Sequence, residues 1–209
     1  MNSVHAEHFE SAPKQAHAAR LGMWIFLASE LLLFAGLFAL YGGYRAHWPA
    51  AFREGIRHST KALGSLNTGI LLVSSTFAAL SVHATRAGRR SRSLLLLAGT
   101  FLLGLLFLGI KLYEYSLHFR EGIYPGGSGA FFSAHPDPGL VPFWTLYFAT
   151  TGLHAIHVSV GLIVLGCTCF ALWRGTVGVH RAHPLENAAL YWHLIDTIWI
   201  FVWPLYYLA

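Results

Sequence analysis

Charged residues are scarce in this chain. Asp, Glu, Lys and Arg make up 11% of its 209 residues, whereas a soluble globular domain carries about 25%. Hydrophobic residues make up 55%, so the composition excludes an ordinary water-soluble fold. Lys and Arg outnumber Asp and Glu by 14 to 9, but the basic residues stand between long apolar blocks. That placement is typical of membrane topology signals and does not indicate nucleic-acid binding.

Cysteine is almost absent, and common motifs of soluble catalysis are missing. The two cysteines, Cys167 and Cys169, stand at i and i+2 inside an apolar block. On a helix these positions point to different sides, which excludes a disulfide or a shared metal and indicates small packing residues. The chain contains no P-loop, Gly-x-Gly-x-x-Gly turn, Cys-x-x-Cys pair or nucleophile elbow. The sequence therefore offers no self-contained active site.

Five long apolar blocks dominate the sequence instead. A bilayer core about 30 Å thick needs roughly 20 apolar helical residues, and each block is long enough. The blocks do not alternate polar and apolar residues, which argues against a transmembrane barrel. We therefore predict an all-α polytopic membrane bundle, a single membrane domain over residues 1–209. A polar tail covers residues 1–19, and the five transmembrane helices cover about 21–44, 62–85, 93–115, 145–172 and 187–208.

Smaller signals predict packing and orientation. Glycines in the third block are expected to let helices approach closely, namely Gly99, Gly104 and Gly109. The first block is longer than the apolar region of a signal peptide, which predicts an uncleaved first helix. The densest basic cluster, between Arg86 and Arg92, lies in the shortest connection. By the positive-inside rule this predicts a cytoplasmic N-terminus and a C-terminus outside.

Glu30 is an acidic residue inside the first block. It stands nine residues after Leu21, about 13 Å along a helix. A lone carboxylate at that depth is costly, so we expect Glu30 to be protonated and hydrogen-bonded to a side chain on another span. The candidate partners are histidines, of which the last matches best in depth: His154, His157 and His193. Either a proton-linked or lipid-contacting role, or a purely structural bond, would fit.

Two further groups of ionisable residues lie in the fourth and fifth blocks. His154 and His157 stand at i and i+3 on one helix face. They are suited either to ligate a metal or haem or to bond across helices. In the fifth block a stripe at helical spacing should point into the bundle or toward a partner subunit, not toward lipid. Its members are Glu186, Ala189, His193, Asp196 and Ile200.

Several short motifs follow one another along these blocks. They are Gly22–Glu30, Leu66–Thr68 with Ser74–Thr76, Lys111–Tyr115, Thr151–Val158, and Glu186 with Tyr191–Asp196 and Trp199. Together they resemble subunit III of the haem-copper respiratory oxidases, over nearly the whole chain after about residue 18. The five-helix form is similar to the bacterial version. Two departures, Ala155 and the proline of Trp203-Pro204, leave the ionisable residues untouched.

The resemblance implies a non-catalytic role in aerobic respiration. Subunit III carries no haem or copper, which belong to partner subunits. It binds beside subunit I, in a complex that also contains subunit II, and it holds phospholipid. It is thought to support proton uptake and durability of an enzyme that oxidises cytochrome c or quinol. The resemblance places the chain in the bacterial cytoplasmic (inner) membrane.

Basic residues at the span ends are candidates for contacts with phospholipid head groups. Arg20, His83 and Arg86 could meet the phosphates.

Three alternatives stay open on the sequence alone. One is a subunit III-like protein associated with nitric oxide reductase. Another is a free-standing membrane haem or metal protein that uses His154, His157 and His193. The third is a proton-coupled transporter that uses Glu30 and Asp196, although no inverted repeat or broken-helix pair is visible.

Overall fold

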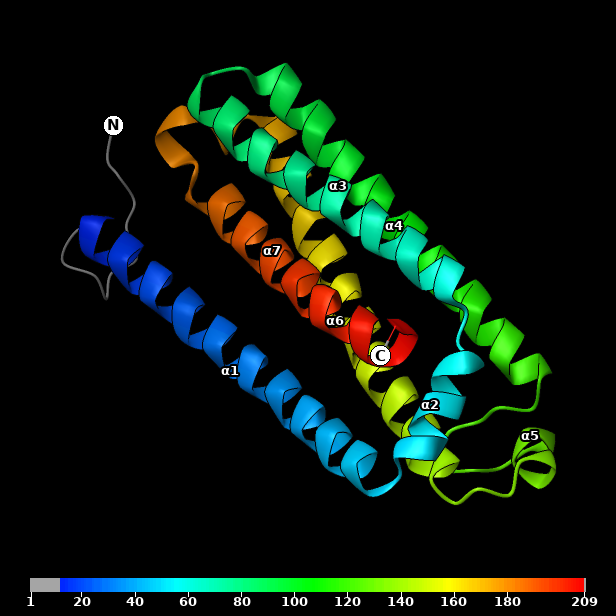
Figure 1. Ribbon diagram of the computed structural model, residues 1–209. Coiled ribbons are helices and arrows are strands. Elements are labelled where there is room, and N and C mark those ends of the chain that lie inside the picture. The colour runs from blue at the N-terminus through cyan, green and yellow to red at the C-terminus, as the bar shows by residue number, and fades with distance from the viewer. Residues whose placement is uncertain (1–11, 209) are drawn as a thin grey trace.

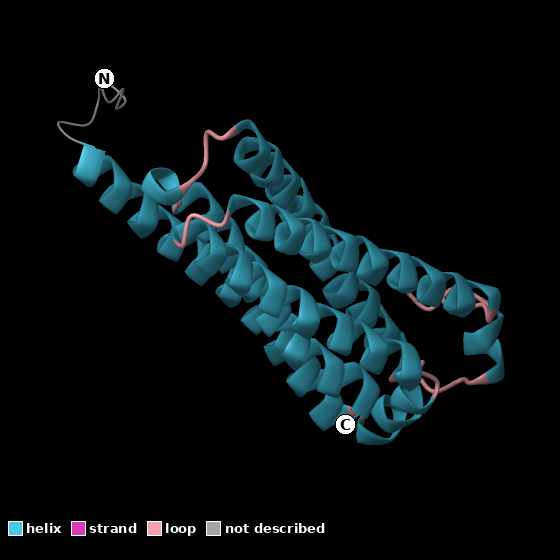
Figure 2. Cartoon of the chain, turned by 90° about the horizontal axis from the view of Figure 1, so that it is seen from above, coloured by secondary structure: helices cyan, strands magenta, loops and turns pink. Residues whose placement is uncertain are grey.

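Five long helices form the protein. The computed structural model describes residues 12–208, which contain no strand. The long helices are α1 (Ala12–His47), α3 (Lys61–Arg86), α4 (Arg90–Arg120), α6 (Leu140–Arg174) and α7 (His183–Trp203) (Figure 1). They run along a common direction, with the connections at the two ends (Figure 2). Five spans are long and apolar enough to cross a membrane, which confirms the predicted multi-pass all-α membrane fold.

Shorter elements fill the ends of the bundle. They are α2 (Pro49–Arg57), α5 (Ala130–Ala134), the 3-10 helix η1 (Val179–Arg181) and the π-helical turn η2 (Pro204–Leu208). Helix α2 was not predicted from the sequence; it begins with a proline in its first turn and buries one apolar face. The turn η2 starts where α7 meets Pro204, because proline lacks the backbone N–H that an α-helix needs. Of the predicted polar tail, residues 12–19 belong to α1 and residues 1–11 lie outside the described range.

The fourth helix, α4, is longer than predicted. It continues to Arg120 and ends in a glycine-capped turn, in which Gly122 has φ 76°. The Ile123 N–H donates to the His118 carbonyl at 2.9 Å, and the Gly122 N–H donates to the Phe119 carbonyl at 3.1 Å. This pair of bonds is the Schellman motif, which satisfies carbonyls that the helix end would leave free. Residues 116–120, which follow the predicted third span, are therefore helical.

Helices α3 and α4 form the most extensive helix contact. Small hydroxyl residues hold this hairpin together. Ser74 donates to the Thr100 carbonyl at 3.2 Å, and Ser93 donates to the Ser81 carbonyl at 3.0 Å. In lipid, helix pairs gain little from the hydrophobic effect, so close backbone approach and interhelical hydrogen bonds hold them. The short turn between the helices uses Gly88, whose φ is 72°.

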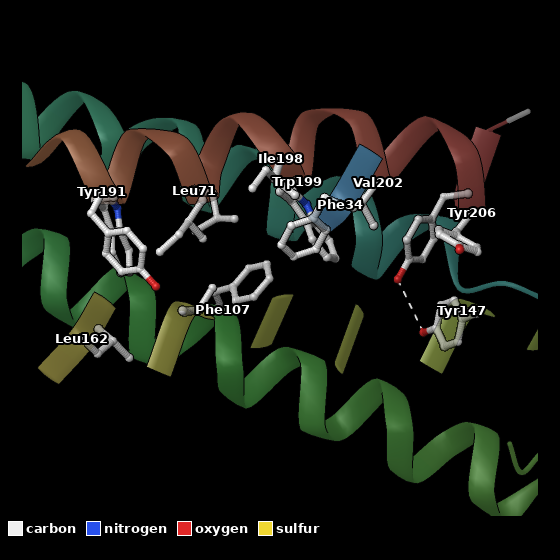
Figure 3. Packing of buried hydrophobic residues seen from close by; sticks show 14 of the residues in the cluster. Phe34, Leu71, Phe107, Tyr147, Leu162, Tyr191, Ile198, Trp199, Val202 and Tyr206 are labelled. Carbon is white, nitrogen blue, oxygen red and sulfur yellow. Dashed lines mark hydrogen bonds between the residues drawn. The ribbon is translucent and has the colours of Figure 1, made fainter. Parts of the chain in front are cut away.

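Helix α1 is the least enclosed of the five long helices. It contacts α6 and α7, and its buried residues Leu27, Phe34 and Tyr41 are spaced seven residues apart. The Phe34 ring packs against His154 and His157 of α6, whereas Tyr41 packs against Phe52 of α2 and Tyr206 of η2. Figure 3 shows Phe34 gathered with Phe107 and Trp199 between the helices. The rings of Phe107 and Trp199 meet edge to face with centroids 4.9 Å apart. The core is therefore aromatic, while most of α1 faces outward.

The glycines of α4 point in three different directions. A Cβ added to Gly104 would lie 2.6 Å from Trp192, and one added to Gly99 would lie 2.9 Å from Phe77. These two confirm the predicted close approaches. The expectation for Gly109 is wrong, because nothing lies within 4 Å of such a Cβ. Five residues rotate about 140° around a helix, so the third glycine points out of the bundle.

Replacing Gly104 with Ala is expected to lower stability, because the new methyl group must displace both Trp192 and Leu162. Overpacking of this kind costs about 1–3 kcal/mol. Thermal unfolding in mild detergent measures the change. Gly109→Ala is the matched control on the same helix and should match or exceed the wild type. Equal loss in both variants would contradict the packing argument.

Candidate functional site

Glu30 is hydrogen-bonded to another span, as predicted, but the partner is His157. Glu30 Oε2 lies 2.6 Å from His157 Nε2, whereas the better-matched candidate, His193, bonds elsewhere. His157 Nδ1 lies 2.8 Å from the Leu153 carbonyl. A carbonyl only accepts, so Nδ1 carries a proton. One further proton therefore lies between Nε2 and the carboxyl group, and the pair is net neutral whichever atom holds it.

His154 has a different environment from His157, which lies one turn away on α6. It is fully buried among the rings of Phe34, Phe107 and Trp199, with centroids 6.4, 5.6 and 5.0 Å from its own. Neither of its ring nitrogens has a hydrogen-bond partner among the described residues. The two histidines of α6 therefore do not converge on one ligand, and only His157 reaches a carboxyl group.

The polar residues of α7 face α3. His193 Nδ1 lies 2.5 Å from Ser75 Oγ, and Asp196 lies close enough to His193 to interact electrostatically. Asp196 is 6% exposed, and its Oδ1 has no hydrogen-bond partner among the described residues. Next to this group, Trp192 Nε1 donates to Ser74 Oγ at 3.1 Å. These contacts fasten α7 to the α3 face.

The members of the predicted stripe on α7 differ in their surroundings. Ala189 and Asp196 are buried, and Glu186 and His193 line a cleft. Ile200 is 42% exposed and does not point into the bundle, so for this position the expectation of a partner subunit stays a prediction. A strict seven-residue repeat drifts by about 20° per heptad on a straight helix, which carries the last position toward the outside.

A buried ion pair that sequence reasoning missed lies in the C-terminal part of α4. Lys111 Nζ donates to Glu114 Oε2 at 3.0 Å, to Tyr147 at 3.0 Å and to Tyr207 at 2.7 Å. Glu114 Oε1 accepts from Tyr147, Tyr207 and Thr60 at 2.9, 2.8 and 2.8 Å. The two charged side chains are 2% and 0% exposed. We call these five residues the Lys111 cluster. It joins α4 to α6, to η2 and to the start of α3.

A cleft of about 500 Å³ opens between α1, α3 and α7. Arg86 donates from Nε and Nη2 to Glu186 Oε1 at 3.1 and 2.9 Å, and His193 lines the same cleft. Arg20 lines it from α1. His83, the third candidate for head-group contact, instead lines a separate pocket of about 430 Å³ with Arg89 and Arg92. The three basic residues therefore do not form one site.

No metal centre can be assembled from the described residues. Among the side chains that the structure describes, no group of three or more His, Cys, Asp or Glu could hold a metal ion. Cys167 and Cys169 are both free thiols. The polar side chains instead join helix to helix, at Glu30 with His157, at Ser75 with His193, and in the Lys111 cluster.

The sequence is similar to known oxidase subunits over almost its whole length. The family described as Cytochrome c oxidase subunit III matches residues 4–209. A probable quinol oxidase subunit 3 from Staphylococcus epidermidis is 27% identical over 209 residues, 97% of this chain and 94% of that protein. A probable quinol oxidase subunit 3 from Staphylococcus aureus (strain USA300) is 26% identical, over 95% of this chain and 92% of that protein.

Proposed function

Because the chain belongs to the cytochrome c oxidase subunit III family, we propose that it stabilises subunit I of its complex. The same complex would also contain subunit II. The chain is a subunit III of a haem-copper oxidase, a multi-pass member of a respiratory complex with other oxidase subunits. The observation that carries the proposal is the family match over residues 4–209. The interhelical bonds agree with it, because they build a rigid scaffold rather than an open catalytic centre.

The experiment that tests this role starts from the tagged chain in mild detergent. We expect subunits I and II to copurify, and oxygen consumption to survive removal of this chain while the enzyme loses activity faster during turnover. Copurification of no oxidase subunit would contradict the proposal. Two of the three alternatives, a nitric oxide reductase-associated protein and a free-standing haem or metal protein, are not favoured by the quinol oxidase relatives.

The location and orientation are part of the proposal. We place the chain in the bacterial inner membrane with its N-terminal end in the cytoplasm and its C-terminus outside. The start of α1, the α3–α4 turn and the connection from α6 to α7 lie at one end of the bundle (Figure 1). The basic cluster of that turn comprises Arg86, Arg89, Arg90 and Arg92. Positive residues in short connections favour the cytoplasmic side.

The cleft between α1, α3 and α7 is the proposed phospholipid site. Arg86 is already engaged by Glu186, so Arg20 is the cation with no ion-pair partner among the described residues that line this cleft. Trp24 and Leu190 supply apolar lining for an acyl chain. A basic group beside an apolar groove at a membrane surface suits an anionic head group.

Replacing Arg20 with Gln is expected to weaken lipid retention. Native mass spectrometry of the complex should show reduced occupancy of a phospholipid, since a cation near the surface contributes about 1 kcal/mol to head-group binding. His83→Gln is the control, because His83 faces another pocket. Equal lipid content in the wild type and Arg20→Gln would refute the assignment of this cleft.

The ionisable residues provide the basis for the proposed support of proton uptake. His193 lines the cleft and contacts Ser75, with Asp196 close by on the same helix, and the Glu30–His157 pair joins α1 to α6. Such groups can hold or pass a proton where lipid cannot. Proton uptake by the complex with His193→Gln, measured in vesicles against the wild type, tests this role.

A further inference from the structure

The Glu30–His157 pair is partly open to the outside of the bundle at the middle of the membrane. The side chains are 17% and 13% exposed. His157 stands at the centre of α6, which runs from Leu140 to Arg174, and Glu30 follows Arg20 by ten residues in a 28-residue span. At 1.5 Å per residue, both lie about 15 Å or more from the helix ends of their spans. An ionisable pair is therefore exposed at a depth where lipid offers no hydrogen bonds.

Other exposed polar groups on the membrane faces need no outside partner. Ser29 donates to the Phe26 carbonyl at 2.7 Å, and Ser159 donates to the Ala155 carbonyl at 2.8 Å. Thr76 and Thr197 bond in the same way to carbonyls four residues earlier. These hydroxyl groups are satisfied by their own helices, so hydrocarbon can cover them at little cost.

Glu30 differs from these residues because only one of its oxygens is engaged. Oε2 pairs with His157, while no described side chain donates to Oε1. A polar atom left without a partner in hydrocarbon costs free energy comparable to a lost hydrogen bond. Intramembrane ionisable residues accordingly face protein or a water-filled cavity rather than acyl chains. A polar partner from outside this chain would remove that cost.

We propose that the face of α1 and α6 on which Glu30 and His157 are exposed seats a transmembrane helix of another subunit of the oxidase. That helix would place a hydrogen-bond donor, such as Ser, Thr or Asn, against Glu30 Oε1. The inference rests on the proposed function, because it requires the partner subunits of the complex. It goes further by assigning the face of this chain that meets one of them.

The residues beside the pair suit such a contact. Leu33 and Val160 stand three residues after Glu30 and His157, so each lies on the same helix face as its ionisable neighbour. They are 48% and 44% exposed. Helix α1 is the least enclosed of the long helices, and no helix of the described residues covers its outer side (Figure 1). A partner helix laid here would cover both the apolar flanks and the polar pair.

Steric substitution tests this face. Val160→Trp and Leu33→Trp add a large apolar side chain that the bilayer tolerates but that a docked helix does not. Each variant is purified through a tag in mild detergent, and the copurifying oxidase subunits are quantified. We expect about a tenfold fall in retention, equivalent to ~1.4 kcal/mol of association free energy. Leu95→Trp and Leu102→Trp are matched controls on α4, where the leucines are 75% and 63% exposed, and both should retain the partners.

Two further measurements make the outcomes decisive. The melting temperature of each isolated variant checks that the bundle still folds, and a photo-crosslinking amino acid at position 160 identifies the neighbour. Crosslinks to an oxidase subunit support the inference, whereas crosslinks to phospholipid alone overturn it. Full retention by Val160→Trp, or loss in the α4 controls alone, also overturns it. If the wild-type chain retains no oxidase subunit, the proposed function itself fails, which is a separate result.

Discussion

Replacing Lys111 with Met is expected to destabilise the bundle by about 3–5 kcal/mol, the cost of leaving one member of a buried ion pair without its partner. Glu114 would stay in the core with its Oε2 unpaired, and Tyr147 and Tyr207 would each lose the ammonium group that they accept from. Reversible unfolding of the purified chain in mixed detergent micelles measures the loss. We expect this loss to exceed that of Gly104→Ala.

Two controls separate charge pairing from general disruption. The double variant Lys111→Met with Glu114→Gln should be more stable than the sum of the single losses predicts, with a coupling of about 0.5–3 kcal/mol. Arg57 and Glu54 form an exposed pair at the same sequence separation, 3.4 Å apart. Arg57→Met should cost no more than about 1 kcal/mol. Strict additivity in the double variant, or equal losses at the two pairs, would show that pairing does not stabilise the core.

Replacing Glu30 with Ala is expected to loosen the bundle by about 1–3 kcal/mol, because His157 Nε2 would be left without a partner. Glu30→Gln should preserve assembly, since its amide can donate to a neutral Nε2 in the same place. Neither change should abolish electron transfer, because no redox centre lies at this pair. Subunit retention and oxygen consumption in both variants measure the effect.

The protonation of Glu30 requires its own measurement. We predict a protonated carboxyl group at neutral pH, which infrared difference spectroscopy detects as a carboxylic C=O band that disappears in Glu30→Gln. An ionised Glu30 at pH 7 would contradict this prediction. So would complete loss of haem reduction in the Gln variant, because a scaffold residue should leave the redox centres working.

Sequence reasoning predicted the spans well because the bilayer imposes a simple rule of length and apolar content. It predicted the kind of bond that Glu30 makes for a similar reason, since a buried carboxyl group needs a partner. It chose His193 over His157 because counting residues gives depth but not which helices are neighbours. Helix α7 turns His193 toward Ser75 on α3, and that rotation depends on packing across the whole bundle.

The Lys111 cluster was missed for a different reason. Lys111 and Glu114 follow an apolar block, and charges at that place in a sequence usually indicate the end of a span. The helix continues to Arg120, so both residues stay inside the bundle. Their i, i+3 spacing, which allows a direct ion pair on a helix, was the available signal. The tyrosine partners at positions 147 and 207 come from distant segments and could not be found by spacing.

Helix α1 is synthesised before the helices that it contacts, and this order affects its insertion into the membrane. Glu30 and His157 are 127 residues apart, so at about 5–20 residues per second the ribosome needs roughly 6–25 s to supply the partner. During that interval Glu30 must insert into the bilayer alone. A centrally placed acidic residue such as Asp opposes insertion by about 2.5–3.5 kcal/mol, and each Leu favours it by about 0.3–0.6. The leucines that directly follow Glu30, Leu31 to Leu33, thus help the membrane accept this helix before any neighbour exists.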